Sequence, residues 1–205
     1  RQVILLGMTT VVMYMAAGGS MKLFLSCVGT MFVTLVIGLT TIIKPYQLQR
    51  IKTWRHPESD PLGAGYNIIQ SLIAFASGGF SGVGYGGSIQ KLSYLPECHT
   101  DFIFAIVGEE LGFIGSVIII AILCLIVLQC IRVARHAKDK KGMYIAAGIG
   151  SLVAFQTFIN IGVATALLPN TGLPLPFISY GLSSLVSMSA GIGLVLNINL
   201  QKKKY

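Results

Sequence analysis

Charged residues, histidine and cysteine are all scarce in this sequence. Only 11% of the 205 residues are charged and 54% are hydrophobic, and the mean hydropathy is +0.76. A soluble domain needs more surface charge than this, so lipid is the expected solvent of the chain. The three histidines and four cysteines lie in separate loops or apolar runs. We therefore expect neither a disulfide framework nor a Cys/His metal site.

No signal peptide is expected, because the first apolar run follows Arg1 directly, without a polar leader or a small-residue cleavage site. Since the first residue is not Met, we expect a piece of a longer protein. Part of any functional site would then lie on the remaining sequence.

Long apolar runs fill most of the chain. A bilayer core of about 30 Å takes roughly 20 apolar residues as a helix. Six runs predict an all-α, polytopic membrane helix bundle that forms a single domain over residues 1–205. The expected spans are residues 2–18, 21–43, 65–80, 102–131, 143–168 and 176–200. The third run is short and bracketed by glycines, so it either crosses or re-enters. Crossing is favoured, because re-entry would move the later basic cluster to the opposite side.

The basic residues set the expected orientation. Six spans place both ends of the chain on one side, and basic loops favour the cytoplasmic side. With Arg1 inside, all but two of the 15 Lys and Arg residues lie on inner segments, the exceptions being Lys22 and Lys91. The outer surface then consists mainly of loops 81–101 and 169–175. This placement accounts for the net charge of +8, so nucleic acid is not an expected partner.

Four of the seven acidic residues gather at one expected outer helix entrance: Glu97, Asp101, Glu109 and Glu110. A carboxylate at the mouth of a membrane span is costly, which makes it a functional candidate. Thr100 is expected to cap the fourth span, which places Asp101 in the first turn, where the helix favours an anion. An ionised carboxylate beside a cavity can accept a proton from a sugar hydroxyl. The alternative is a purely structural aspartate.

The helical projection indicates where these carboxylates point. At about 100° per residue, three glycines share a stripe with Asp101, so its carboxylate is expected to face the bundle. These glycines are Gly108, Gly112 and Gly115. Glu109 and Glu110 point elsewhere, and a buried structural hydrogen bond is expected for each. This arrangement argues against a two-carboxylate glycosidase.

Two further loops carry polar candidates. The glycine-rich run 78–87 follows an apolar segment and lacks a GK[ST] sequence, so it is not a phosphate-binding loop. We expect the loop from Gly78 to Thr100 to be mobile until substrate or partner binds; the alternative is that its glycines only permit tight packing and the loop is rigid. Lys91 follows the glycine-rich run and could contact a diphosphate or anchor at the headgroups. Before the last span, prolines force a non-helical loop, after which Ser179, Tyr180 and Ser183 serve helix packing or bind sugar hydroxyls.

Four motifs together resemble the FtsW/RodA (SEDS) family. They are SDPLGAGY at 59–66, HTDFIFA at 99–105, GEELG at 108–112 and GLPLPFISYG at 172–181. They follow the family's order over nearly all of the chain after residue 45. QKLSYLPE at 90–97 looks more like FtsW, whereas SDPLGAGY fits RodA at least as well. Leu182 departs from the family, which usually has Gly there.

The resemblance implies a ten-span protein of the bacterial cytoplasmic membrane, of which this chain would hold the last six spans. It implies polymerisation of lipid II on the outer leaflet, together with a class B penicillin-binding transpeptidase and, for a septal role, divisome proteins. The family's essential carboxylate corresponds to Asp101. The matching motifs add Gln70 and His99 as substrate-binding candidates.

The implied chemistry is glycosyl transfer, with Asp101 as general base on the acceptor hydroxyl and polyprenyl diphosphate as leaving group. Lys91, basic residues outside this chain or a divalent ion, Mg²⁺ or Mn²⁺, would neutralise the diphosphate. Septal synthesis is favoured over elongation by QKLSYLPE and by the glycine before EELG. The alternatives are a lipid II flippase and a non-catalytic scaffold. A flippase needs polar groups near the midplane, whereas the acidic residues here crowd the outer mouth.

Overall fold

The computed structural model describes residues 2–20, 22, 25, 26, 29, 30, 53–63, 65–92, 95, 96 and 98–201. Within these ranges the regular structure is helical and contains no strand. The α-helices are α1 (Gln2–Ala16), α4 (Tyr66–Gly78), α5 (Ile103–Arg135), α6 (Lys140–Ala164) and α7 (Leu182–Leu200), and two short 3₁₀ helices are η1 (Pro57–Ser59) and η2 (Gln90–Leu92). Helices α5, α6 and α7 are long and apolar enough to cross a membrane. The expected polytopic helical membrane fold is confirmed.

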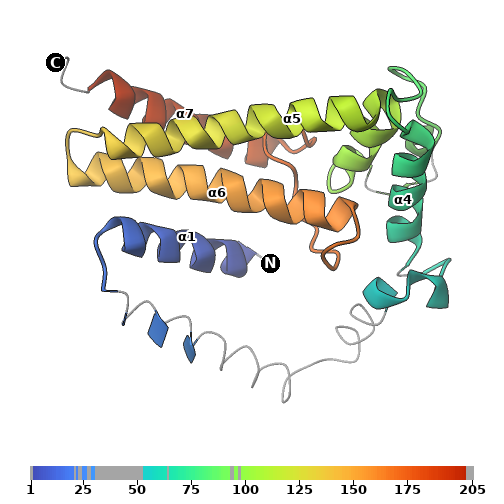
Figure 1. The fold of residues 1–205 in the computed structure, drawn as a ribbon, viewed down its shortest axis with the longest axis horizontal. Coiled ribbons are helices and arrows are strands. Elements are labelled where there is room, and N and C mark those ends of the chain that lie inside the picture. The colour runs from blue at the N-terminus through green and yellow to red at the C-terminus, as the bar shows by residue number, and fades with distance from the viewer. Residues whose placement is uncertain are drawn as a thin grey trace.

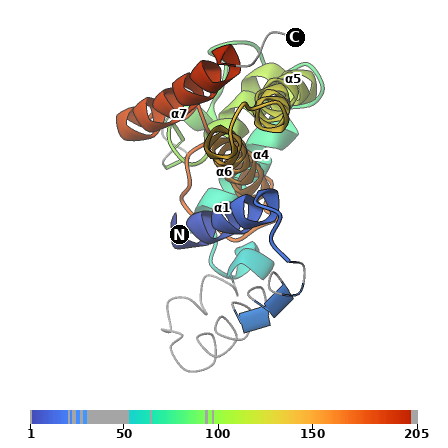
Figure 2. The same cartoon turned by 90° about the vertical axis from the view of Figure 1, so that its left-hand side faces the viewer.

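Helix α6 is the centre of the bundle. It contacts α1, α4, α5 and α7, and Figure 2 shows α1 and α5 on different sides of it. Helices α5 and α6 run antiparallel along the long axis (Figure 1). They approach closely at Gly150, where an added Cβ would lie 2.7 Å from the Cβ of Cys130. Asp139 caps α6 by accepting a hydrogen bond from the Gly142 amide at 3.3 Å.

Helix α4 lies across the end of α5 and α6 rather than alongside them (Figure 1). Its 13 residues span about 20 Å at the helical rise, which is less than the roughly 30 Å of a bilayer core. Gly79, with a positive φ of 52°, ends it, and Ser71 Oγ donates a hydrogen bond to the Ala164 carbonyl at 2.6 Å. The apolar run over residues 65–80 therefore forms a helix shorter than a membrane span, and this helix packs across the end of the bundle. The crossing of this run stays a prediction.

Helix α1 runs beside one part of α6. Gln2 lines a pocket with Leu152 and Gln156, near the middle of α6, whereas Ala16 lines another pocket with Arg135 at the far end of the bundle. The C-terminal part of α7 lies at that far end too, beside the last turns of α5. The expectation that both ends of the chain share one side of the membrane stays a prediction.

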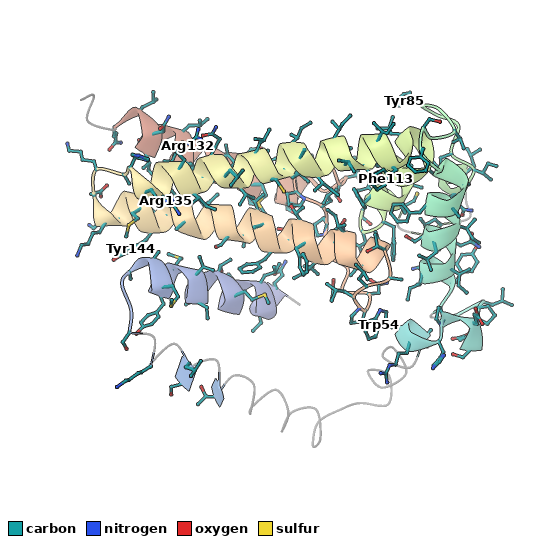
Figure 3. All side chains as sticks on the ribbon, in the orientation of Figure 1. Trp54, Tyr85, Phe113, Arg132, Arg135 and Tyr144 are labelled. Carbon is teal, nitrogen blue, oxygen red and sulfur yellow. The ribbon has the colours of Figure 1, made fainter. Side chains whose placement is uncertain are left out.

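The bundle has two chemically different ends. The basic end carries Arg132, Arg135, Lys138 and Lys140 around the α5–α6 turn, and the opposite end, which we name the Asp101 end, carries the glycine-rich loop. Figure 3 shows Arg132 and Arg135 at one end of α5 and Tyr85 at the other.

The segment before α4 belongs to the Asp101 end. Trp54 Nε1 donates a hydrogen bond to the Ala166 carbonyl at 2.8 Å, just after the end of α6 (Figure 3). Arg55, expected on the same side as the α5–α6 turn, therefore lies away from it. The remaining spans shift modestly, since the last begins at Leu182 instead of 176. Most of the expected span 21–43 lies outside the described residues.

Candidate functional site

Asp101 lies in the turn that precedes α5. The helix begins at Ile103 with Phe102 as its N-cap, and no side chain caps it. The prediction of Thr100 as N-cap and Asp101 in the first helical turn is therefore wrong. Phe102 is 1% exposed and packs in a cluster with Leu95 and other buried side chains. This anchor fixes the start of α5, while Asp101 beside it stays half-buried.

The two residues before Asp101 are held by the loop that precedes α7. The Tyr180 amide donates to the His99 carbonyl at 2.8 Å. Ser179 Oγ donates to the Thr100 carbonyl at 2.5 Å and accepts a hydrogen bond from the Leu175 amide at 2.7 Å. Because this hydroxyl already has two main-chain partners, Ser179 joins the two loops. The exposed side chains of His99 and Tyr180 lie beside this junction.

Asp101 itself is held from α6. Asn160 Nδ2 donates to the Asp101 carbonyl at 2.8 Å and to the Leu173 carbonyl at 2.6 Å. Three consecutive carbonyls, those of residues 99, 100 and 101, thus accept hydrogen bonds from residues far away in sequence. The main chain that carries the candidate base is fixed by α6 and by the loop before α7.

The structure brings some of the other candidates to this region and leaves one apart. Ser183, in the first turn of α7, lines a pocket of 390 Å³ with Gln2 and Pro174. Pro174 follows Leu173, whose carbonyl accepts a hydrogen bond from Asn160. Gln70 is half-buried on α4. Among the hydrogen bonds of the described residues, none joins Gln70 to the segment that carries Asp101.

Lys91 is paired within the protein. Its Nζ lies 3.5 Å from Glu110 Oε1, with the lysine side chain 41% exposed and the glutamate 9% exposed. The Lys91 amide also donates to Ser88 Oγ at 3.1 Å. A diphosphate contact would therefore require this cation to exchange one anionic partner for another.

Glu109 organises the loop in front of α5. It is 2% exposed, and its carboxylate accepts hydrogen bonds from Ser77 Oγ at 3.2 Å, the Ile89 amide at 3.2 Å and the Gln90 amide at 3.4 Å. Ser88 Oγ also donates to it. The expected buried structural role of Glu109 is confirmed. The ion pair of Glu110 with Lys91 gives the second glutamate a structural role as well.

Helix α5 is broken within the GEELG motif. Gly112 has φ 67° and ψ −165°, and an added Cβ there would lie 2.3 Å from the Gly82 nitrogen. The freed amides of Phe113 and Ile114 donate to the carbonyls of Gly79 and Phe80 at 2.9 and 3.3 Å. The expected stripe of glycines below Asp101 is therefore wrong, since the projection assumed an unbroken helix. Gly112 instead admits the glycine-rich loop into the break.

Metal ligands do not gather in the part of the chain that the structure describes, where no three His, Cys, Asp or Glu side chains could hold an ion. Glu109, the most buried carboxylate, already accepts hydrogen bonds from its own loop. The acidic residues of the described segments therefore do not make up a cation site on their own.

Asn160 is the site residue that the motif analysis missed. The signal was present, since Gln156, Thr157 and Asn160 share one face of an otherwise apolar span and all are buried. Polar side chains inside a membrane helix usually face protein and carry structure or function. Asn160 is neither a carboxylate nor part of a loop motif, so the residue patterns that point to Asp101 do not point to it.

Known proteins resemble the chain over its whole length. Residues 1–204 match the FtsW/RodA/SpoVE family, described as cell cycle protein. A relative from Idiomarina loihiensis, "Probable peptidoglycan glycosyltransferase FtsW", is 45% identical over 98% of this chain and 49% of its own length. "Stage V sporulation protein E" from Bacillus subtilis is 46% identical over 93% of this chain and 52% of its own length. The chain thus spans about half the length of these relatives.

Two solved structures are also similar. One, described as "Structural coordination of polymerization and crosslinking by a peptidoglycan synthase complex", matches with a TM-score of 0.75 at 27% identity, over 98% of this chain and 56% of that one. The other is a Rod shape determining protein RodA from Thermus thermophilus that carries an aspartate-to-alanine substitution. It matches with a TM-score of 0.52 at 30% identity, over 65% of this chain and 41% of that one.

Proposed function

Because the chain belongs to the FtsW/RodA/SpoVE family of cell cycle proteins, we propose that the whole protein is a peptidoglycan glycosyltransferase. It polymerises lipid II into glycan strands on the outer face of the cytoplasmic membrane. The observation that carries this proposal is the half-buried Asp101, whose main chain is fixed from α6 at the end of a membrane bundle. The names of relatives at over 40% identity support a role in septal synthesis during division.

In the proposed reaction Asp101 is the general base. It accepts the proton of the acceptor's sugar hydroxyl, whose oxygen attacks the anomeric carbon of the donor sugar. The bond from that carbon to the diphosphate oxygen breaks with inversion, and its electron pair leaves with the polyprenyl diphosphate. A carboxylate in a fixed place favours this step, because the reacting atoms must be held close and aligned.

The neighbouring side chains suit substrate binding. The side chains of His99 and Tyr180 are exposed beside Asp101 in the hydrogen-bonded segment 99–101 and in the loop that holds it. Their imidazole and phenol groups can hydrogen-bond sugar hydroxyls. Ser183 offers a hydroxyl in the adjoining pocket. Lys91 contacts the leaving diphosphate after it releases Glu110, and basic residues elsewhere in the whole protein complete the neutralisation. Gln70, on α4, binds at the edge of the same end.

The same proposal fixes orientation and partners. The basic end faces the cytoplasm by the positive-inside rule, so the Asp101 end faces outward, where the substrate is polymerised. A class B penicillin-binding transpeptidase is the proposed partner, because a similar solved structure is a complex that coordinates polymerization and crosslinking. Divisome proteins follow from the septal role.

Purified full-length protein with its transpeptidase partner tests the activity. In detergent no leaflet exists, so glycan chains formed from labelled lipid II report polymerisation and exclude a pure flippase or scaffold. We expect glycan chains from the wild type. Asp101→Asn should lower the polymerisation rate roughly 100- to 10,000-fold, which is the usual contribution of a general base. Wild-type turnover by Asp101→Asn would refute the assignment. A tagged protein should form a septal band, and lateral patches would indicate elongation.

A further inference from the structure

We propose that Asn160 is a positioning residue for Asp101, an inference that rests on the proposed function and adds a residue to it. Asn160 is 1% exposed. Its single NH₂ group donates at 2.8 Å to the Asp101 carbonyl and at 2.6 Å to the Leu173 carbonyl. One side chain on α6 therefore joins the segment before α5 to the loop before α7.

The chemistry of the side chain fits this position. Both acceptors are main-chain carbonyls of non-helical segments, which cost free energy if buried without a donor. A primary amide offers two protons from one nitrogen, whereas a hydroxyl offers one and a carboxylate none. The orientation of the amide follows from its partners, because the flipped form would set Oδ1 against two carbonyl oxygens.

The other half of the amide supports the same assignment. Asn160 Oδ1 is buried and has no hydrogen-bond partner among the described residues. The protein thus accepts the free-energy cost of an unsatisfied Oδ1, while both hydrogen bonds of Nδ2 are formed. The NH₂ group is therefore the part of the side chain that this position requires.

The effect on Asp101 follows from the order of the hydrogen bonds along the chain. Ser179 and Tyr180 hold the two preceding carbonyls, and Asn160 holds the carbonyl of Asp101 itself. Without it the peptide after Asp101 can rotate, and the carboxylate moves relative to the acceptor hydroxyl. A misplacement of about 1 Å can cost on the order of 100-fold in rate. The binding surface around His99 and Tyr180 keeps its own supports, so kcat falls more than KM rises.

The test compares Asn160→Leu, which keeps the approximate volume and loses both donors, with Asn160→Ser, which keeps one. Thr157→Val is the matched control, because Thr157 lies one turn earlier on the same buried face, and the substitution removes a hydroxyl that has no hydrogen-bond partner among the described residues. In full-length protein with its partner, we expect kcat to fall roughly 10- to 100-fold in Asn160→Leu with little change in KM for lipid II. Asn160→Ser should be intermediate, and Thr157→Val should stay within about threefold of the wild type.

A second measurement separates positioning from loss of folded protein. Lipid II binding is measured in the Asp101→Asn background, where turnover is blocked, with and without Asn160→Leu. Unchanged affinity and stoichiometry support positioning, and a reduced stoichiometry overturns it. Wild-type kcat in both Asn160 variants also overturns it while leaving the proposed function intact, whereas a wild-type protein that forms no glycan chains from lipid II sinks the proposed function itself. If Asn160→Leu does not fold, wild-type kcat in Asn160→Ser decides against the inference.

Discussion

Lys91, on the loop that leads to Asp101, forms an ion pair with Glu110 of α5, with 3.5 Å between Nζ and Oε1. The lysine is partly exposed and the glutamate is nearly buried. Exposed pairs contribute only about 0 to 1 kcal/mol to stability, but loss of the lysine here would leave a nearly buried carboxylate without its cation, which costs more. Lys91 therefore contacts another anion only if that anion compensates for the lost ion pair.

Removal of Lys91 tests whether the cation serves the leaving group. We expect Lys91→Ala to lower kcat/KM for lipid II about tenfold, since a hydrogen bond to a charged group is worth roughly 1.5 kcal/mol or more. Lys91→Arg should retain most activity. Glu110→Gln removes the competing carboxylate and should leave kcat/KM at or above the wild type. Unchanged kinetics in Lys91→Ala would assign the lysine to loop structure alone.

The buried carboxylate of Glu109 should control the order of residues 88–91. Glu109→Ala leaves the amides of Ile89 and Gln90 without their acceptor, at about 1 to 3 kcal/mol for each unpaired buried group. We expect a lower melting temperature in detergent and faster hydrogen exchange at these two amides. Ser77→Ala, which removes one donor and leaves the carboxylate in place, is the milder control. Equal exchange in Glu109→Ala and the wild type would contradict this role.

The glycine-rich loop should be protected from hydrogen exchange in the isolated protein. The amides of Val83 and Gly84 donate to the carbonyls of Glu109 and Glu110 at 3.0 and 3.1 Å. Both carbonyls belong to the broken part of α5. These bonds favour rigid packing over a loop that orders only when substrate or partner binds. Exchange of both amides at the rate of an unfolded peptide, slowed only by the transpeptidase partner, would restore the gating hypothesis.

Gly112 should tolerate no side chain. Its backbone, at φ 67° and ψ −165°, occupies a region that costs other residues about 1 to 3 kcal/mol, and an added Cβ would lie 2.3 Å from the Gly82 nitrogen. We expect Gly112→Ala to lower the melting temperature sharply. Gly193→Ala is the control, because an added Cβ at Gly193 meets nothing within 4 Å and alanine favours helices. Equal stability of both variants would argue against the break in α5.

The sequence predicted the features that depend on local composition. Helices α5, α6 and α7 follow from the length of their apolar runs, whereas the catalytic role of Asp101 stays a prediction. The structural roles of Glu109 and Glu110 were expected because neither pointed toward Asp101. In each case a short stretch of sequence carried the information.

The features that failed depend on contacts between distant residues. The break at Gly112 is possible because the carbonyls of Gly79 and Phe80 accept hydrogen bonds from the freed amides of Phe113 and Ile114. A helical projection of α5 alone does not include these partners. The role of the Asn160 amide becomes visible only in the folded chain, where the carbonyls of residues 101 and 173 both lie beside α6 and accept its hydrogen bonds. The apolar content of the third run likewise does not reveal whether a short helix crosses a bilayer or caps the end of a bundle.

The position of Trp54 predicts on which side of the membrane the segment before α4 lies. Trp54 is bonded to Ala166 at the Asp101 end, so a cysteine at the nearby exposed position of His56 should react with a membrane-impermeant maleimide added outside cells. A cysteine at Tyr85, 93% exposed on the same end, is the positive control, and one at Lys138, beside the α5–α6 turn, should react only after permeabilisation. The native cysteines are replaced first. If the cysteine at position 56 does not react with the external maleimide while the cysteine at position 85 does, residues 65–80 cross the membrane, because only an intervening span can place these two segments on opposite sides.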